Sequence, residues 1–237
     1  DLQRAAWLTF CTCQAVKDGA IRRDVPLAEQ RMIVTGHPKV RHILMAPPSW
    51  PLPLPKTDEN VTRILWDAHH TVGKGWFQFG MFPRIAKDML QWAREDRKTQ
   101  FVFIPHPGLI TIMENGHSGL SPDQLHTFKQ DWAALPNTET SIESDYAKLF
   151  AASDALISDG ISLLAEYQIT GKPVVFLERP DHIEWNEIGS QTIQGAHAVA
   201  DVQQAREYLT QVLKTGANPL SKQEQRTRTR PLYTSPS

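Results

Sequence analysis

Polar residues suited to binding phosphate or moving protons stand directly after three short apolar runs of this sequence. His69 and His70 follow the first run, His106 follows the second, and Asp159 and Gly160 follow the third. A histidine neutralises phosphate oxygens when charged and transfers protons when neutral. In open α/β sheets, ligands bind outside the carboxyl ends of the strands. If the three runs are strands of one such sheet, the pattern predicts an anion-binding crevice between them.

The stretch from Ser153 to Leu177, SDALISDGISLLAEYQITGKPVVFL, indicates most directly that such runs are strands. Its apolar residues predict a short strand over 155–157, a helix over 161–170 and a second strand over 174–177. Gly171 stands where a left-handed cap would end the helix. A strand, a helix and a strand this close together form a βαβ unit, so we expect the two strands to be parallel.

The start of that helix is a further candidate element of the anion site. A helix N-terminus presents unpaired N–H groups and the positive end of a dipole. Gly160 removes side-chain bulk there, Ser162 adds a hydroxyl, and Glu166 follows one turn later on the same face. A phosphate on the N–H groups would leave Glu166 to accept two ribose hydroxyls. The alternative is structural: Asp159 caps the helix, Ser162 is a polar first-turn residue, and Glu166 is solvated.

Metal binding is the rival use of the three histidines, and each is otherwise an ordinary hydrogen-bonded loop residue. Adjacent histidines such as His69 and His70 rarely point at one ion, and no HExxH or paired Cys/His spacing is present. We therefore expect no metal. The loop after His70 contains Gly73-Lys74-Gly75, but it lacks the spacing of a phosphate-binding P-loop.

The composition is that of an ordinary globular protein. Of 237 residues, 41% are hydrophobic and 22% are charged, and the net charge of −1 provides no general attraction for nucleic acid. No apolar run reaches the length of a membrane span, and no signal peptide is present. Cys11 and Cys13 do not form a CxxC pair, so we expect buried or idle thiols in a reducing compartment. These features predict a cytoplasmic protein, and the start at Asp1 predicts a fragment.

The sequence divides into three expected parts, at residues 1–57, 58–216 and 217–237. In the first part we expect a helix, a strand, a short helix and a proline-rich linker, at 1–23, 31–35, 39–45 and 47–55. The linker, PPSWPLPLP, marks the expected domain boundary. The last part is an expected polar helix, over 221–230, with a tail.

Strands and helices are predicted to alternate through the middle part. The predicted strands lie at 63–66, 101–104, 140–142, 155–157, 174–177 and 196–199. The predicted helices lie at 82–94, 110–113, 122–135, 146–152, 161–170 and 202–213. Such alternation is typical of an α/β fold, so we expect a Rossmann-like parallel sheet with helices on both faces.

Four motifs occur in an order and spacing that one known family shares. They are the HP pair at 37–38, ILWDAHHT, FVFIPHP and SDALISDGISLLAEYQITGKPVVF. Together they resemble the CDP-glycerol glycerophosphotransferase family, the teichoic-acid and capsule polymerases of GT-B architecture. The resemblance implies a GT-B C-terminal, donor-binding domain, with His106 against the donor pyrophosphate. The family's phosphate-binding helix start corresponds here to Asp159, Gly160 and Ser162.

The sequence departs from that family in several places. Its helix start reads Ile161-Ser162, where the family often has two serines, and its first strand ends in DAHHT. The WHGT motif that supplies the family's proposed general base does not occur. The resemblance therefore implies an N-terminal acceptor domain outside this chain.

These observations and the resemblance predict a transferase. It is expected to move a glycerophosphoryl or glycosyl group from a CDP-activated donor to a cell-surface polymer hydroxyl, with no cofactor besides the donor. His106 is the expected main cation at the donor phosphates and His70 the second choice. His69 is expected to contact the donor beside them, and Glu166 to bind its ribose.

Two alternatives stay open, a GT-B glycosyltransferase that uses a UDP-sugar and a nucleotide-binding module without catalysis. The expected partners are the donor, a polymer or lipid-linked acceptor and the N-terminal domain, but not nucleic acid. A lipid-linked acceptor implies peripheral contact with the inner face of the membrane.

Overall fold

The computed structural model describes residues 5–53, 61–75 and 77–216. In this part of the chain, six parallel strands form the main sheet in the order β5-β4-β3-β6-β7-β8. They are β3 (Thr62–Ala68), β4 (Thr99–Pro105), β5 (Thr138–Thr140), β6 (Ala155–Ser158), β7 (Val174–Leu177) and β8 (His197–Val199). The chain runs outward from β3 to β5, then returns to place β6 on the other side of β3. This reversal creates the crevice where open α/β sheets bind their ligands.

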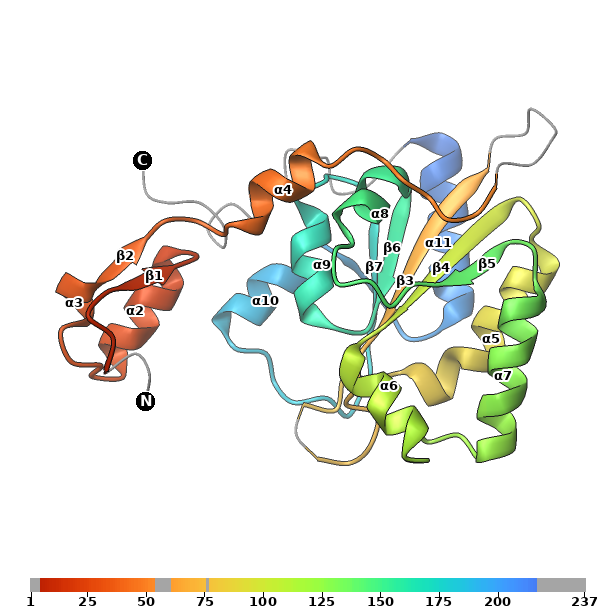
Figure 1. Ribbon diagram of the computed structural model, residues 1–237, viewed down its shortest axis with the longest axis horizontal. Helices are drawn as coiled ribbons and strands as arrows, with labels where there is room; N and C mark the ends of the chain where they lie inside the picture. The colour runs from red at the N-terminus through yellow and green to blue at the C-terminus, as the bar shows by residue number, and fades with distance from the viewer. Residues whose placement is uncertain (1–4, 54–60, 76, 217–237) are drawn as a thin grey trace.

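Helices cover both faces of the sheet (Figure 1), which confirms the expected Rossmann-like α/β fold. They are α5 (Phe82–Glu95), α6 (Pro107–Glu114), α7 (Pro122–Ala134), α8 (Ala147–Ala152), α9 (Ile161–Gln168), α10 (Glu187–Ile193) and α11 (Val202–Thr215). Helices α5, α7 and α11 pack on the face that carries Ile64 and Trp66, whereas α8 and α9 pack on the face that carries Leu65. Neighbouring residues of β3 are therefore buried on opposite faces, as in central strands of parallel sheets.

Aromatic side chains fill the core on one face of the sheet. The Trp66 ring lies 4.3 Å from that of Phe103 and 5.5 Å from that of Trp132, measured between centroids. Phe82 and Phe128 complete the cluster. The start of helix α7 is fixed by a capping box, in which the side chains of Ser121 and Gln124 each accept the other residue's backbone N–H.

The N-terminal part contains a second, two-stranded parallel sheet. Strand β1 (Thr9–Cys11) pairs with β2 (Met32–Val34), and α2 (Gln14–Arg22) and α3 (Ala28–Arg31) connect them. The predicted helix over 1–23 is therefore wrong at 9–11, where strand pairing overrides the local apolar pattern that suggested a helix. Both cysteines are buried free thiols, as expected.

Helix α4 (Lys39–Met45) joins this small sheet to the large one. Its bounds are those predicted, and its Ile43 lies in the same apolar cluster as Leu65 and Phe150. After α4 the chain is without helix or strand as far as Pro53, whose carbonyl accepts a hydrogen bond of 2.8 Å from the Gln100 amide. The end of the proline-rich linker and the predicted helix over 221–230 lie outside the described residues.

Most other boundaries agree with the prediction to within two residues, including those of β5, which lies two residues earlier than predicted. Helix α6 differs more clearly, because it starts at Pro107 rather than at 110, and the short helix α3 was not predicted. Helix α10 was not predicted, although Asn186 is a standard N-cap whose side chain accepts from the Gly189 N–H at 2.8 Å. Within the described residues, no helix is long and apolar enough to cross a membrane.

We predict that Trp66→Ala destabilises the main sheet by about 3–5 kcal/mol, because the side chain is fully buried among other rings and its removal leaves a cavity. Urea denaturation measures this free energy. Ile142→Ala is the control, because Ile142 is 76% exposed and should change stability by no more than about 0.5 kcal/mol. Equal effects of the two changes would contradict the assigned core.

Candidate functional site

The structure brings three histidines together at the carboxyl ends of β3 and β4. The His70 ring lies between the other two, with its centroid 4.3 Å from that of His69 and 4.3 Å from that of His106. The His70 and His106 rings are stacked. Each residue is partly exposed, so the cluster lies at the carboxyl edge of the sheet rather than in the core.

His106 has a defined tautomer because it caps helix α6. Its Nδ1 accepts the N–H of Gly108 at 3.0 Å, so in the neutral ring the proton is on Nε2. Gly108 is needed here, since a Cβ at this position would lie 3.1 Å from Cγ of His70. Helix capping therefore orients His106 as an N–H donor beside the first turn of α6.

His69 is oriented in a similar way by its own loop. Its Nδ1 lies 2.9 Å from the Thr71 hydroxyl and accepts the Thr71 N–H at 3.3 Å. The Thr71 hydroxyl also accepts the N–H of Phe79 at 3.0 Å, which ties the two ends of the loop together. His70 differs, because its buried Nδ1 has no hydrogen-bond partner among the described residues.

Two of these histidines favour the neutral form in the free protein. Burial lowers the pKa of His69 to about 4, and the charges of His70 and His106 contribute. Burial, followed by the charge of His70, also lowers the pKa of His106. His106 is therefore expected to be a neutral donor until an anion binds, since a nearby negative charge favours the protonated ring.

Asp159 does not cap helix α9 and does not face solvent. Its carboxylate is fully buried and accepts the backbone N–H groups of His69 and Met81, both at 2.5 Å. Gly160 is the N-cap instead, without a side-chain bond. A carboxylate in this position is unsuited to contact a phosphate, so the structure corrects the predicted direct role of Asp159 to one of holding the histidine loop.

A second carboxyl lies beneath the same loop. Asp67, in β3, is 6% exposed and accepts a hydrogen bond of 2.6 Å from the Ser158 hydroxyl. Burial raises the pKa of Asp67 to about 7. Burial also raises the pKa of Asp159 well above its usual value, and the charge of Asp67 adds to this. The site thus rests on two buried acids that both favour protonation.

Gly160 and Ser162 lie at the start of α9, where the sequence placed them. Gly160 is buried against the histidines, and a Cβ on it would come within 3.1 Å of Cδ2 of His69. Ser162 is exposed in the first turn of the helix. The glycine therefore lets the helix N-terminus approach the imidazole cluster, and the serine hydroxyl is open to a ligand.

Glu166 is buried rather than solvated, which overturns the structural alternative for this residue. Only 7% of it is exposed. One carboxylate oxygen lies 3.1 Å from the Lys39 ammonium, and the other accepts a hydrogen bond from the Tyr146 hydroxyl. Each oxygen can accept more than one bond, so this pairing leaves acceptor capacity for ribose hydroxyls.

The sequence did not identify several residues that shape the site. Thr71 orients His69, while Lys39 and Tyr146 bind Glu166. Arg179 follows β7 and contacts the same loop. A charged residue directly after a predicted strand was the available signal for Arg179. Nothing in the spacing links Lys39 to Glu166, which lies 127 residues away.

Among the described residues, no group of three or more His, Cys, Asp or Glu side chains is arranged to hold a metal ion. The three imidazoles are stacked or tilted against one another, which is a packing arrangement rather than convergence of lone pairs on one point.

No protein-family model matches this sequence, and no curated protein matches it either. Solved structures are similar in fold. A UDP-GlcNAc 2-epimerase from Neisseria meningitidis has a TM-score of 0.57 at 17% identity over 98% of this chain and 58% of its own. MnaA of S. aureus, solved with UDP, has a TM-score of 0.59 at 13% identity over 99% of this chain and 58% of its own.

The wall teichoic acid polymerase TagF is also similar, with a TM-score of 0.58 at 14% identity over 98% of this chain and 54% of its own. This chain thus spans little more than half the length of the structures it matches. At such low identity the likeness shows the fold alone, which is the Rossmann-like α/β architecture described above.

We predict that His69 titrates near pH 4 in the wild-type protein and that His106→Ala raises this pKa, because one neighbouring charge is removed. Imidazole ¹⁵N NMR across a pH series measures both values. The lowered pKa means that protonation favours the unfolded chain. The stabilising contribution of His69 is therefore present above pH 6.5 and lost as the pH falls toward 4. A pKa of His69 near its usual value of 6.5 in the wild-type protein would contradict the burial of this ring in the cluster.

Proposed function

We propose that the crevice between β3 and β6 binds the phosphates of a nucleotide-activated donor. In this proposal the chain is the donor-binding part of a transferase that moves a glycerophosphoryl or glycosyl group to a polymer hydroxyl. A CDP-activated donor such as CDP-glycerol is the first choice, because the sequence motifs resemble the family that uses it.

The main support is the meeting of three histidines with two helix N-termini at the reversal of strand order. Helices α6 and α9 start directly after β4 and β6, and each is eight residues long. The first-turn N–H groups of α9 and the Nε2–H of His106 are donors suited to phosphate oxygens, whereas the Gly108 N–H of α6 is used by Nδ1 of His106, so α6 contributes the positive end of its dipole. The position at the strand ends is the one that open α/β sheets use for ligands.

The proposed chemistry assigns these residues to the leaving group. In glycerophosphoryl transfer, the acceptor oxygen attacks the phosphorus that carries glycerol, and the bond to the oxygen of the departing CMP breaks. Negative charge grows on that oxygen as the bond lengthens. His106 at hydrogen-bond distance would become a better partner at that stage, and its protonation would favour departure. His70 would take the same role from the adjacent ring.

Glu166 and Ser162 are proposed to set the position of the donor. Ser162 would donate its hydroxyl to a phosphate oxygen at the helix start. Glu166 would accept the ribose hydroxyls one turn further along α9, while Lys39 and Tyr146 hold its carboxylate in place. Asp159 would act from below by fixing the backbone of His69.

A UDP-activated sugar is the main alternative donor, and the similarity to MnaA solved with UDP supports including it in any test. The second alternative is a module that binds a nucleotide without catalysing transfer. Turnover with donor and acceptor by a longer protein that contains this chain would exclude the second alternative.

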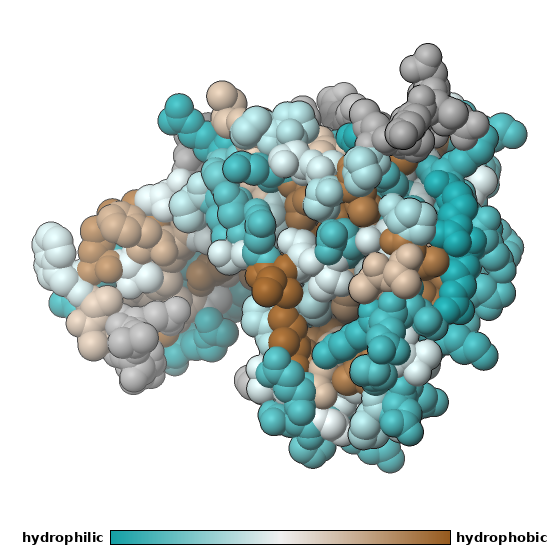
Figure 2. Space-filling view, turned by 45° about the vertical axis from the view of Figure 1, so that its right-hand side comes forward, coloured by the Kyte–Doolittle hydropathy of each residue, from teal (hydrophilic) through white to brown (hydrophobic). Residues whose placement is uncertain are grey.

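A further domain is the proposed partner of the N-terminal sheet. Parallel sheets are usually covered on both faces, yet Phe10 and Ile33, paired across β1 and β2, are 67% and 44% exposed. Trp7 nearby is 83% exposed. Figure 2 shows tan and brown apolar surface over this unit, at its left. We propose that an acceptor-binding domain packs there, and that a lipid-linked acceptor brings the assembly to the inner membrane face.

We predict that His106→Ala weakens CDP-glycerol binding by roughly tenfold to a hundredfold, because a charge-assisted hydrogen bond of about 1.5–3 kcal/mol is lost. Titration calorimetry of the wild type with CDP-glycerol, CMP, UDP and UDP-GlcNAc measures binding and identifies the base. Ser162→Ala should weaken binding in the same direction.

His126→Ala is the matched control, since His126 is an exposed histidine of α7 that does not belong to the three-histidine cluster. It should leave the affinity unchanged. Unchanged donor affinity in His106→Ala, combined with a lower melting temperature, would identify His106 as a structural loop residue.

We predict that Glu166→Gln reduces the preference for CMP over deoxy-CMP, because the amide accepts ribose hydroxyls less well than a carboxylate does. Calorimetric affinities for the two nucleotides, in wild type and variant, give the ratio directly. Glu207→Gln is the control, because Glu207 is an exposed glutamate on α11 outside the proposed site, and its replacement should preserve the preference. Equal preferences in wild type and Glu166→Gln would place the ribose elsewhere.

A further inference from the structure

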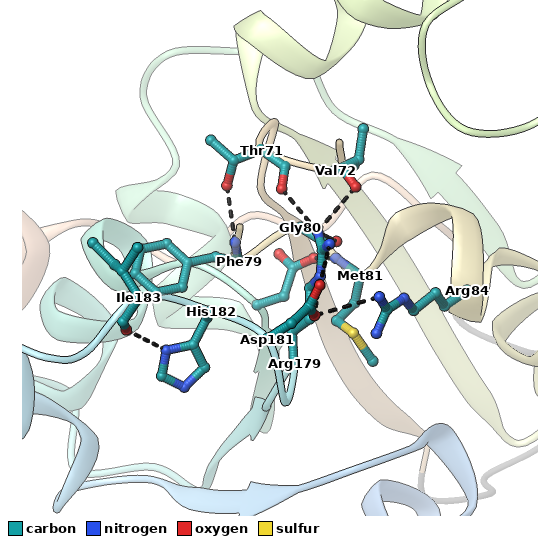
Figure 3. Close-up of polar contacts among 11 residues, drawn as sticks. Thr71, Val72, Phe79, Gly80, Met81, Arg84, Arg179, Asp181, His182 and Ile183 are labelled. Atoms are coloured by element: carbon teal, nitrogen blue, oxygen red, sulfur yellow. Dashed lines mark hydrogen bonds and ion pairs between the residues drawn. The ribbon is translucent and has the colours of Figure 1, made fainter. Parts of the chain in front are cut away.

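Arg179 is a buried cation that the proposed chemistry does not use. It follows strand β7 and is only 3% exposed. A buried charge is costly unless it is paired and fully hydrogen-bonded, so its partners indicate what it does. Figure 3 shows the guanidinium pointing toward the two ends of the loop between β3 and α5.

The guanidinium binds backbone carbonyls at both ends of that loop. Its Nη1 donates to the carbonyl oxygens of Thr71 at 3.2 Å, Val72 at 2.9 Å and Gly80 at 3.4 Å. The Gly80 N–H in turn donates to the Thr71 carbonyl at 3.1 Å. Arg179 therefore joins the residues that leave β3 to the residues that enter α5.

The remaining donors of Arg179 are fixed by a carboxylate. Nε and Nη2 bind the two oxygens of Asp181 at 2.7 and 2.9 Å, a bidentate pair that sets the plane of the guanidinium. Asp181 also lies 3.4 Å from Arg84 in α5. The same segment holds the loop once more, because the Ile183 N–H donates to the Phe77 carbonyl at 3.2 Å.

Arg179 and Asp159 bind the same loop through different backbone groups. Arg179 binds carbonyl oxygens, whereas the Asp159 carboxylate binds the N–H groups of His69 and Met81. The peptide unit between Gly80 and Met81 is held by both, through its C=O and its N–H respectively. The loop is therefore fixed at its ends by two buried polar side chains that follow neighbouring strands.

A short chain of contacts leads from the guanidinium to an imidazole. Arg179 binds the Thr71 carbonyl, and the Thr71 hydroxyl lies 2.9 Å from Nδ1 of His69. The His69 ring then packs on His70, which stacks on His106. A shift of Thr71 would therefore move the His69 ring and, through the ring contacts, the His106 ring, whose Nε2 carries the proton in the neutral form.

We propose that Arg179 is a positioning residue, which sets the orientation of His69 and the packing of the three-histidine cluster by fixing the ends of the 71–80 loop. For donor binding, this inference rests on the function proposed above. Lysine is not an adequate substitute, because a single ammonium cannot bind three carbonyls and form a bidentate pair with a carboxylate at once.

The test compares Arg179→Lys and Asp181→Asn with Lys172→Met. Lys172 is a matched control, since its ammonium also binds three backbone carbonyls, of Phe150, Ala151 and Ser153, but before β7 and so at the other end of the sheet. Asp181→Asn weakens the bidentate pair that orients the Arg179 guanidinium. Because Asp181 is partly exposed, this variant can be measured even if Arg179→Lys does not fold. Imidazole NMR and CDP-glycerol calorimetry are the measurements, with melting temperature as the index of stability.

In Arg179→Lys and Asp181→Asn we expect the pKa of His69 to rise from about 4, because the ring becomes better solvated. We also expect the affinity for CDP-glycerol to fall about tenfold or more, as for the loss of one charge-assisted bond. Lys172→Met should lower the melting temperature while leaving both quantities unchanged.

An unchanged His69 titration in both variants would overturn the proposal, as would an equal shift of that titration in Lys172→Met, which would indicate a general loss of stability. The NMR result does not depend on the ligand. If the wild-type protein binds none of the nucleotides, the proposed function fails, and the NMR comparison still decides the role of Arg179.

Discussion

The candidate site depends on one buried carboxyl group, that of Asp159, which connects two other segments of the chain by hydrogen bonds. Asp159 ends β6, yet its oxygens accept the N–H groups of His69 after β3 and of Met81 before α5. Strand pairing alone brings β3 and β6 side by side, but it leaves the backbone beyond the strands free to choose its course. A carboxylate with two amide partners removes that freedom. The helix start at Gly160 and the histidine cluster are then fixed relative to each other, because both continue from residues that Asp159 connects.

The cluster that results combines weak charge with strong hydrogen-bonding capacity. Burial, followed by the charges of the neighbouring imidazoles, lowers the pKa values of His69 and His106, so these two rings favour the neutral form in the free protein. It nevertheless presents ring N–H groups and helix N–H groups in one place. Such a site would attract an anion at short range and acquire charge only when the anion is present. This property suits the function proposed above, in which the site would bind a donor and then release a phosphate-bearing product.

Much of this architecture could be predicted from the sequence because its signals are local. The short apolar runs before His69, His106 and Asp159 are buried on both faces and are strands, and the glycine at 160 marks a close approach. The N-terminal helix was wrong at 9–11, because the pairing of β1 with β2 is not visible in a local pattern. The sequence offered a phosphate contact for Asp159, or a helix cap as the alternative, and it could not show the backbone contacts that the structure has, since their partners are 90 and 78 residues away in the chain. The position of Arg179 after a predicted strand was a weak signal, and its partners could not be predicted, because every residue type carries the backbone carbonyl that the guanidinium binds.

The sequence distance between these partners has a consequence for biosynthesis. His69 is made 90 residues before Asp159, and Thr71 is made 108 residues before Arg179. The histidines therefore leave the ribosome long before either buried charge exists to fix their loop. Strands β3 and β4 can pair in the meantime, but the crevice beside β3 stays open to solvent until β6 arrives. Because long segments close slowly, the ligand site can form only after β6 and β7 have been made and have joined the sheet.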